Sequence, residues 1–469
     1  MLTRIFTTIT MFVILCLASA GSAQPPRPNL VIIYVDDLGY SDVGCYGSPL
    51  IRTPRIDQLA REGMRFTDAY SPAPVCTPSR AGLLTATHPQ RLGLMQLPNE
   101  TPRGGVGRVL YANSRHGLHP EEITLAELLR EHGYATMCVG KWHLGDAEPF
   151  LPTRQGFDHY FGMPNSNDMK PEIVMRDEQV VENPADADTL LERYTHESLE
   201  FIRRSNDQPF LLYLAHNMPH TPLTISERFR GRSARGLYGD VVEAIDWSVG
   251  EILDELARLG LDDRTIVIFT SDNGPWHARG EQGGHANPLR GAKGTTYEGG
   301  MRVPFIVRHP RQIPAGSECR EPITQMDIMP TMAAIIGAAM PSDRVIDGRD
   351  IGPLLRGELD AKSPHERLVY YGDGRLNAVR SGQWKFKLPT TLQEETLYGR
   401  YEQPNAVVPL ALYDLHLDPG EQKNVAADHP EIVERLTAYA EQARQDIGDE
   451  RSGTVGQNTR PVGRIDRRD

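Results

Sequence analysis

Three short, uninterrupted apolar runs constrain the fold of this chain most strongly. They are NLVIIYV at residues 29–35, PFLLYLA at residues 209–215 and TIVIFT at residues 265–270. Runs of this kind are typical of strands that are buried on both faces, as strands are in a parallel sheet. The sequence therefore predicts a sheet whose central strands come from segments far apart in the chain.

Helical patterns lie between the predicted strands. The clearest one ends at a glycine at position 260, and its apolar residues recur at helical spacing, at Val241, Ile245, Val249, Ile252 and Leu256. Alternating strands and helices predict a doubly wound α/β core, with helices on both faces of the sheet. In that architecture, polar residues that directly follow a strand point into the ligand crevice. Asp36-Asp37, His216 and Asp272-Asn273 all follow predicted strands in this way.

The pattern loosens at residues 352–364 and then changes. Short strand candidates follow at residues 368–371, 378–379, 384–388 and 410–414, before a periodic helical segment at residues 430–447. We therefore expect a large domain over residues 24–360 and a small α+β domain over residues 361–448, in which a helix packs on an antiparallel sheet. Residues 449–469 have almost no apolar side chains, and we expect them to be disordered.

The first 23 residues have the layout of a secretory signal peptide. Arg4 precedes an apolar run from Ile5 to Leu17, and small residues follow up to Ala23. A membrane anchor is the alternative, but it needs about 20 apolar residues, and threonines dilute this shorter run. We expect a secreted or periplasmic protein without stable membrane insertion.

Charge and cysteine content narrow the possible functions further. The formal net charge is −12, so the chain is a poor general binder of nucleic acid. Of the five cysteines, Cys16 lies in the signal segment and Cys76 lies in the motif described next. Cys45, Cys138 and Cys319 remain, and three cysteines allow at most one disulfide among themselves, so the core must supply most of the stability.

Cys76-Thr77-Pro78-Ser79-Arg80 is the most specific motif of the sequence. Pro78 favours the first turn of a helix, so Cys76 is expected at a helix start. A lone cysteine is ordinarily a buried structural residue. This pentapeptide, however, resembles the C-x-P-x-R signature of the type I sulfatases, in which an enzyme oxidises the cysteine to formylglycine. The continuation at residues 83–86 (LLTA) and 91–93 (RLG) resembles the same family.

The implied chemistry explains why an aldehyde is useful at this position. The hydrate of an aldehyde has two hydroxyls on one carbon, so one can accept the sulfuryl group and the other can then expel sulfate. A serine would instead remain sulfated until a second attack at sulfur. One helical turn further, Arg80 would orient the diol and balance developing negative charge.

Asp36-Asp37 and Asp272-Asn273 offer hard oxygen ligands. A single acidic pair after a strand is more often a turn or a helix cap. Two such pairs beside a polar nucleophile indicate a divalent cation, with calcium favoured and magnesium left open. The resemblance implies the same site, since V-D-D-x-G-Y-x-D at residues 35–42 and S-D-N-G at residues 271–274 match motifs that hold one metal together with the oxygen of the formylglycine made from Cys76.

Four further cationic or imidazole residues match family motifs. They are Lys141, His143, His220 and Lys293, in VGKWHLG, MPHTP and LRGAKG. Taken singly, each would more often be a packing or surface residue. The resemblance implies that Lys141 binds sulfate and the diol, that His143 is the base that collapses the hemiacetal, and that His220 and Lys293 hold the ester oxygen and protonate the leaving alcohol. His216 ranks below His220 because the family pattern places the acid beside prolines.

The resemblance covers residues 29–337 motif by motif and continues through WKFK at residues 384–387 and DPGE at residues 418–421. It implies an alkaline-phosphatase-like fold, a sulfated small molecule or glycan as substrate, and a formylglycine-generating enzyme as partner. The C-terminal part is similar to the arylsulfatase A and N-acetylgalactosamine-6-sulfatase branch. Two alternatives remain open: a phosphonate monoester or phosphodiester hydrolase of the same superfamily, and a secreted glycan-binding protein whose Cys76 is never oxidised.

Overall fold

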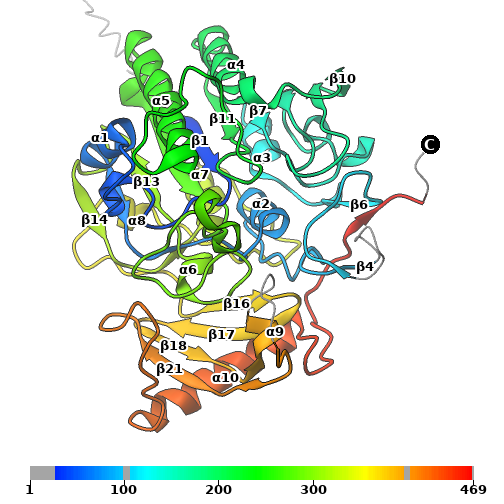
Figure 1. Cartoon of the computed structure of the whole chain (residues 1–469), viewed down its shortest axis with the longest axis vertical. Helices are drawn as coiled ribbons and strands as arrows, with labels where there is room; N and C mark the ends of the chain where they lie inside the picture. Colours follow the sequence, from blue (N-terminus) through cyan, green and yellow to red (C-terminus); the bar gives the residue numbers. More distant parts are fainter. Residues whose placement is uncertain (1–26, 99–105, 396–401, 467–469) are drawn as a thin grey trace, which may run out of the picture.

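The computed structural model describes residues 27–98, 106–395 and 402–466. Within them the chain forms a large α/β domain and a smaller domain below it in Figure 1. The segment for which a signal peptide is predicted, residues 1–23, lies outside the described residues.

The large domain is built on one ten-stranded sheet. Its strand order is β10 (Gln179–Glu182), β9 (Val174–Arg176), β8 (His159–Gly162), β7 (Ala135–Gly140), β11 (Phe210–Ala215), β1 (Asn29–Val35), β12 (Thr265–Ser271), β13 (Phe305–Arg308), β2 (Met64–Phe66) and β14 (Ser317–Cys319). The five strands from β8 to β12 in this order pair in parallel, whereas β9, β10 and β13 pair antiparallel with their neighbours. The three predicted apolar runs are β11, β1 and β12, side by side at the centre.

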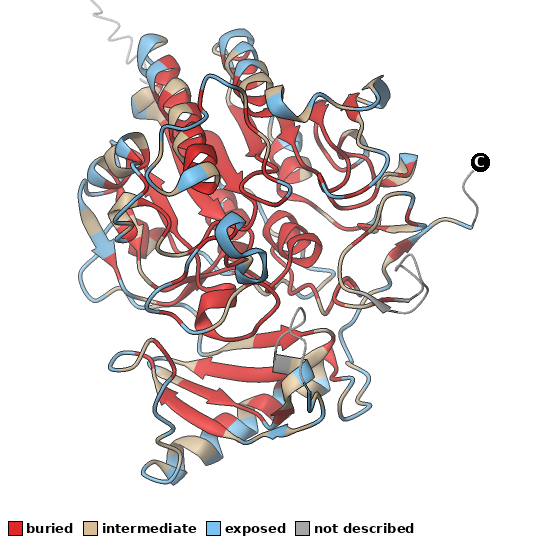
Figure 2. Ribbon diagram, viewed as in Figure 1, coloured by how far each residue is buried: buried red, intermediate tan, exposed pale blue. Residues whose placement is uncertain are grey.

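Helices cover both faces of this sheet, as the alternation predicted. On one face α2 (Cys76–Thr85), α3 (Leu125–Glu131), α7 (Ile328–Ile336) and α8 (Gly352–Leu355) join a core with Leu30, Ile32 and Tyr34 of β1. On the other, α1 (Pro54–Glu62), α4 (Leu190–Arg204) and α5 (Gly236–Arg258) pack with Val31, Ile33 and Val35. Side chains of a strand alternate between faces, and both faces of β1 are buried, which explains its continuous apolar sequence (Figure 2).

The smaller domain is an antiparallel sheet with a helix packed on it. Its strand order is β16 (Leu368–Gly372), β17 (Arg375–Ser381), β18 (Trp384–Lys387) and β21 (Ala411–Asp414), and α10 (Pro430–Ile447) covers it. Leu436 and Ala440 of α10 are fully buried against this sheet. The predicted strands and the predicted helix are confirmed.

Besides several 3-10 turns, the described residues form further short strand pairs and two short α-helices. They are β3 (Ala69–Tyr70) with β15 (Ile323–Thr324), β4 (Leu97–Pro98) with β5 (Val106–Gly107), β6 (His116–Gly117) with β22 (Gly463–Arg464), β19 (Thr390–Thr391) with β20 (Val407–Val408), α6 (Glu298–Met301) and α9 (Leu392–Glu395).

The expected disorder after residue 448 is not found in residues 449–466. This tail crosses back to the large domain, where β22 pairs antiparallel with β6. The Arg460 side chain bonds both carboxylate oxygens of Glu122, with distances of 2.6 and 2.9 Å. Backbone pairing and ion pairs hold the tail, and Val462 is partly buried against the core of the large domain. Most of these contacts do not depend on apolar residues, which is why the composition of the tail gave the wrong prediction.

Two further observations concern membranes and thiols. Among the described residues, no helix is long and apolar enough to cross a bilayer. Cys45, Cys76, Cys138 and Cys319 are all free thiols.

Candidate active site

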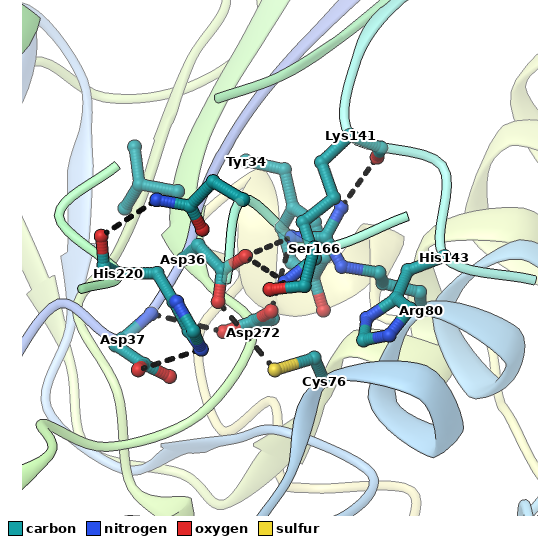
Figure 3. A network of polar contacts seen from close by, with 12 residues as sticks. Tyr34, Asp36, Asp37, Cys76, Arg80, Lys141, His143, Ser166, His220 and Asp272 are labelled. Atoms are coloured by element: carbon teal, nitrogen blue, oxygen red, sulfur yellow. Dashed lines mark hydrogen bonds and ion pairs between the residues drawn. The ribbon is translucent and has the colours of Figure 1, made fainter. Parts of the chain in front are cut away.

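The polar residues that follow the central strands meet at one edge of the sheet. Asp36 and Asp37 come directly after β1, Asp272 and Asn273 after β12, and Lys141 after β7. The hydrogen bonding between β1 and β12 continues one residue beyond the end of β12, where the Asp272 amide donates to the Val35 carbonyl at 3.0 Å. Figure 3 shows Asp36, Asp37, Asp272 and Lys141 gathered around the first residue of α2.

That residue is Cys76, which is only 2% exposed. Its Sγ lies 3.5 Å from Asp36 Oδ1 and 3.3 Å from Lys293 Nζ. Burial raises the pKa of the thiol well above its usual range, so the unmodified cysteine is not an activated thiolate. The start of a helix carries partial positive charge from its free N–H groups, which favours an anion at this position.

Arg80 lies one helical turn after Cys76 and is completely buried. Its Nη2 forms ion pairs with Asp36 Oδ2 at 3.3 Å and Asp272 Oδ2 at 3.0 Å, and its Nη1 donates to the Lys141 carbonyl at 2.6 Å. Burial alone would lower the pKa of the guanidinium, but Asp272 and Asp36 raise it, so the cation is fixed in place. Arg80 thereby ties α2 to the ends of β1, β12 and β7.

Lys141 and His143 follow β7 and also lie near Cys76 (Figure 3). Lys141 Nζ is 2.5 Å from Asp36 Oδ2 and donates to Ser166 Oγ at 3.1 Å. His143 Nε2 donates to the Leu110 carbonyl at 2.9 Å, which fixes the tautomer and leaves Nδ1 without a hydrogen-bond partner among the described residues. Burial and the charge of Lys141 lower the pKa of His143 well below its usual range. The ring is therefore neutral, and its Nδ1 carries a lone pair that no described residue uses.

His220 and Lys293 approach Cys76 from the loops beyond β11 and β12. Lys293 Nζ lies 2.7 Å from Asp37 Oδ1, and His220 Nε2 lies 3.7 Å from Asp37 Oδ2. The half-buried Trp276 contacts both, with its ring centroid 4.6 Å from Lys293 Nζ and 5.2 Å from the His220 ring. Burial and the charge of Lys293 lower the pKa of His220 well below its usual range. His220 is accordingly a neutral hydrogen-bonding group.

The donor set fits a hard divalent cation. Ligand atoms of Asp36, Asp37, Cys76 and His220 lie within 4.8 Å of one another. The buried Asn273 Oδ1 has no hydrogen-bond partner among the described residues, and an amide oxygen without a donor suits a metal. Asp272 lies beside this group, with its Oδ1 accepting from the Asp37 amide at 3.1 Å. Burial and the charge of Asp36 raise the pKa of Asp272 to about 7, because both make its ionised form unfavourable. Added positive charge would stabilise the ionised carboxylate and lower this pKa again.

Comparison with known proteins identifies the family. The sulfatase family model matches residues 28–338, and a model of the C-terminal region of aryl-sulfatase matches residues 363–463. The chain belongs to the sulfatase family. It is a sulfuric ester hydrolase of the arylsulfatase type, and members of the family generally act through formylglycine and a divalent metal.

The sulfatase is similar to several characterised relatives over most of their length. N-acetylgalactosamine-6-sulfatase of Mus musculus is 40% identical, covering 90% of this chain and 86% of the relative. Arylsulfatase A of Homo sapiens is 38% identical, covering 89% and 88%. Steryl-sulfatase of Mus musculus is 36% identical, covering 90% and 83%. The relatives thus include the branch that the C-terminal sequence predicted.

Solved structures agree with the fold of the sulfatase. A Pseudoalteromonas sulfatase superposes with a TM-score of 0.80 at 26% identity, covering 93% of this chain and 92% of the other. A Bacteroides thetaiotaomicron structure, from work on the metabolism of multiple glycosaminoglycans, gives a TM-score of 0.77 at 29% identity, covering 90% and 100%. The alkaline-phosphatase-like fold predicted for the catalytic domain is confirmed.

The structure distinguishes His216 from His220. It also places residues at the site that the sequence analysis did not single out. His216 turns away from the sulfatase site and bonds Ser248 Oγ on α5 at 3.2 Å, in agreement with its lower rank. Ser166, Trp276 and Asn167 were missed. Asn167 donates to the His220 carbonyl at 3.1 Å, so it holds that loop. The run Asn165-Ser166-Asn167 after β8 was the available signal, since it too follows a strand of the sheet.

Proposed function

We propose that this sulfatase removes sulfate from sulfated carbohydrates outside the cytoplasm, through a formylglycine made from Cys76. The observation that carries the proposal is the position of Cys76 at the start of α2, between the buried cations of Lys293 and Lys141 and one helical turn before Arg80. The hydrated aldehyde would supply two hydroxyls on one carbon at this point. Carbohydrate is favoured because an N-acetylgalactosamine-6-sulfatase is among the relatives at 40% identity.

Asp36, Asp37, Asp272 and Asn273 would hold a divalent cation beside residue 76, and we favour calcium because carboxylate and amide oxygens converge there. When bound, such a cation supplies positive charge that polarises sulfate oxygens and lowers the pKa of a neighbouring hydroxyl.

The cationic side chains would bind and orient the sulfate. Lys141, Lys293 and Arg80 are buried side chains that would form a clamp for the sulfate, and fixed charges in a buried site stabilise an anionic transition state strongly. Arg80 would act mainly by orienting the carboxylates and the helix, because both its Nη atoms are already engaged. Lys141 and Lys293 each have an ammonium group directed at the centre of the site.

The histidines and Lys293 would move or hold protons. His143 Nδ1 is the proposed acceptor of the hydroxyl proton when sulfate is expelled, since Nε2 is committed to Leu110. His220 is neutral and would donate a hydrogen bond to the ester oxygen, while Lys293 would deliver the proton to the leaving alcohol. The role predicted for the two residues together is thus divided. His220 would hold the ester oxygen, and Lys293 would supply the proton.

The decisive test of this proposal is the mass of the tryptic peptide that contains Cys76, measured on active protein. Formylglycine is lighter than cysteine, so conversion is read directly. Cys76→Ala should abolish hydrolysis of an aryl sulfate while leaving the fold intact by circular dichroism. Full activity in protein whose Cys76 is unmodified would overturn the proposal, and so would turnover by the alanine variant.

Substrate class is tested with paired and panel substrates. We expect a large preference for an aryl sulfate over the matching aryl phosphonate, because the relatives at 36–40% identity are sulfatases. Among sulfated galactosamine, galactose, glucosamine and fucose, at least one should exceed the aryl sulfate in kcat/KM. A preference for phosphonate would instead assign the phosphonate hydrolase alternative.

We further propose export through a cleaved signal at residues 1–23, a catalytic domain at residues 24–360 and a small domain at residues 361–448, with a formylglycine-generating enzyme acting on Cys76. N-terminal sequencing of protein recovered from the culture medium or periplasm tests the first point. A mature terminus at residue 24 or 21 is expected, whereas an intact Met1 would contradict it.

A further inference from the structure

The loop that carries Lys293 is attached to the small domain by a buried lysine. Lys385 of β18 is buried, and its ammonium group lies 2.9 Å from Glu298 Oε1, 2.9 Å from Glu421 Oε1 and 2.9 Å from the Thr296 carbonyl. Thr296 and Glu298 belong to the catalytic domain and follow Lys293 by three and five residues. Lys385 thus connects the C-terminal sheet to the end of this loop.

Glu421 holds both ends of the same loop. Its Oε2 accepts from the Glu298 amide at 2.7 Å, and its carbonyl accepts from Arg290 Nη1 at 3.1 Å. The two ends also bond each other, since the Gly299 amide donates to the Arg290 carbonyl at 2.7 Å. Residues 290–299 therefore form a closed loop whose base rests on Lys385 and Glu421.

The tip of the loop reaches the active site. The Gly294 amide donates to the Pro74 carbonyl at 2.8 Å, two residues before Cys76, and the Lys293 amide donates to the Pro275 carbonyl at 2.9 Å. A Cβ atom on Gly274 would lie 1.8 Å from the Gly299 carbonyl oxygen, so the base of the loop also packs directly on the backbone after Asn273. Movement of the base would have to move Lys293.

We propose that Lys385 and Glu421 are positioning residues for Lys293, so that the small domain sets the assistance given to the leaving alcohol. This inference rests on the proposed role of Lys293. Removing the Lys385 ammonium would leave Glu421 without its cationic partner and would leave Glu298 with Arg302, 3.5 Å from its Oε2. Loss of one partner of a buried ion pair is strongly unfavourable. The loop would shift and carry Lys293 away from residue 76.

The predicted signature is a dependence on the leaving group. A displaced proton donor matters most when the leaving alcohol is a poor one and little when it departs unaided. A displacement near 1 Å can cost about 100-fold in rate. A loss that came only from general destabilisation would instead lower all substrates by the same factor, because it reduces the amount of active protein.

The experiment measures kcat/KM over a series of aryl sulfates with graded phenol pKa, for the full chain and the variants Lys293→Ala, Lys385→Met and Glu421→Gln. The exposed Lys423→Met serves as the matched control. We expect Lys293→Ala to steepen the dependence on phenol pKa most, Lys385→Met and Glu421→Gln to steepen it in the same direction, and Lys423→Met to match the unaltered chain.

The outcomes distinguish the positioning role of Lys385 and Glu421 from the proposed role of Lys293 on which it rests. If Lys293→Ala does not steepen the dependence, the proposed role of Lys293 is wrong. If Lys293→Ala steepens it and Glu421→Gln lowers all substrates equally or leaves them unchanged, the positioning inference is wrong. Glu421→Gln removes one charge and keeps the shape, so it answers the question even where Lys385→Met yields no folded protein.

Discussion

Arg80 and Asp272 form an ion pair in which neither side chain is exposed, with Nη2 and Oδ2 3.0 Å apart. Removing one partner of a buried pair leaves the other charge uncompensated, which costs about 3–5 kcal/mol. We therefore expect Arg80→Met to lower the unfolding free energy by about that amount and to abolish activity. Urea denaturation measures the change, with the exposed Arg435→Met as control. Equal stability of the two variants would contradict the structural role of Arg80.

Removal of the divalent cation should reduce activity and the melting temperature together, because a ligand that binds only the folded state stabilises it. After dialysis against a chelator, calcium should restore both quantities at a lower concentration than magnesium. Asp37→Asn should raise the concentration needed by at least about 10-fold. Restoration by magnesium at equal or lower concentration would show that the calcium assignment is wrong.

His143→Ala should reduce kcat by about 10²–10⁴-fold, the usual contribution of a general base. The neutral ring with a free Nδ1 predicts that the loss falls on expulsion of sulfate and not on the first sulfuryl transfer. A rapid-mix measurement should then show a burst of released phenol followed by slow turnover. A variant that loses the burst as well as the turnover would place His143 in the earlier step.

Stability at acid pH should depend on His88. Burial lowers the pKa of this histidine to about 4, below its ordinary value of about 6.5, so the folded protein keeps it neutral. Its contribution is complete above pH 6.5 and is lost as the pH falls through that window to about 4, up to about 3 kcal/mol. His88→Gln should therefore show a flatter decline of unfolding free energy between pH 6.5 and 4, whereas the exposed His416→Gln should follow the parent.

The ordered tail gives a further prediction. Arg460 bonds Glu122, which is 5% exposed, so Arg460→Met would leave this buried carboxylate with only the longer contact to Arg344, at 3.8 Å. We expect a loss of about 3 kcal/mol in unfolding free energy, compared with a negligible change for Arg464→Met, whose side chain is exposed on the same tail. Differential scanning calorimetry distinguishes the two variants, and equal melting temperatures would mean that the tail contributes little.

Local patterns in the sequence were sufficient to predict the core of the fold. The apolar runs of β1, β11 and β12 and the periodic residues of α5 report burial directly, because each depends only on neighbours in the chain. The antiparallel strands at the two margins were not foreseen: β2 and β9 are three residues each, too short for alternation to be read. The disorder predicted for the tail was wrong for a different reason. Arg460 and Glu122 are 338 residues apart in the chain, and amino-acid composition gives no information about such a pair.

The residues of the active site also divide into those that the local sequence predicts and those that it does not. Cys76, Asp36 and Asp272 could be predicted because each lies in a motif at the start of a helix or the end of a strand. Lys385 could not, since a lysine in a strand is ordinarily exposed and only tertiary packing places it between two carboxylates. Trp276 was missed because its contacts with Lys293 and His220 join two separate loops.

The pairing of β22 with β6 means that the small domain is joined to the catalytic domain at both of its ends. A domain held by a single linker can swing as a rigid body about one hinge, but two attachments restrict rotation to the axis through both of them. The buried ion pair of Lys385 with Glu298 opposes rotation about that axis as well. Proteolytic cleavage between residues 338 and 367 should therefore yield two fragments that stay together and unfold in one cooperative transition.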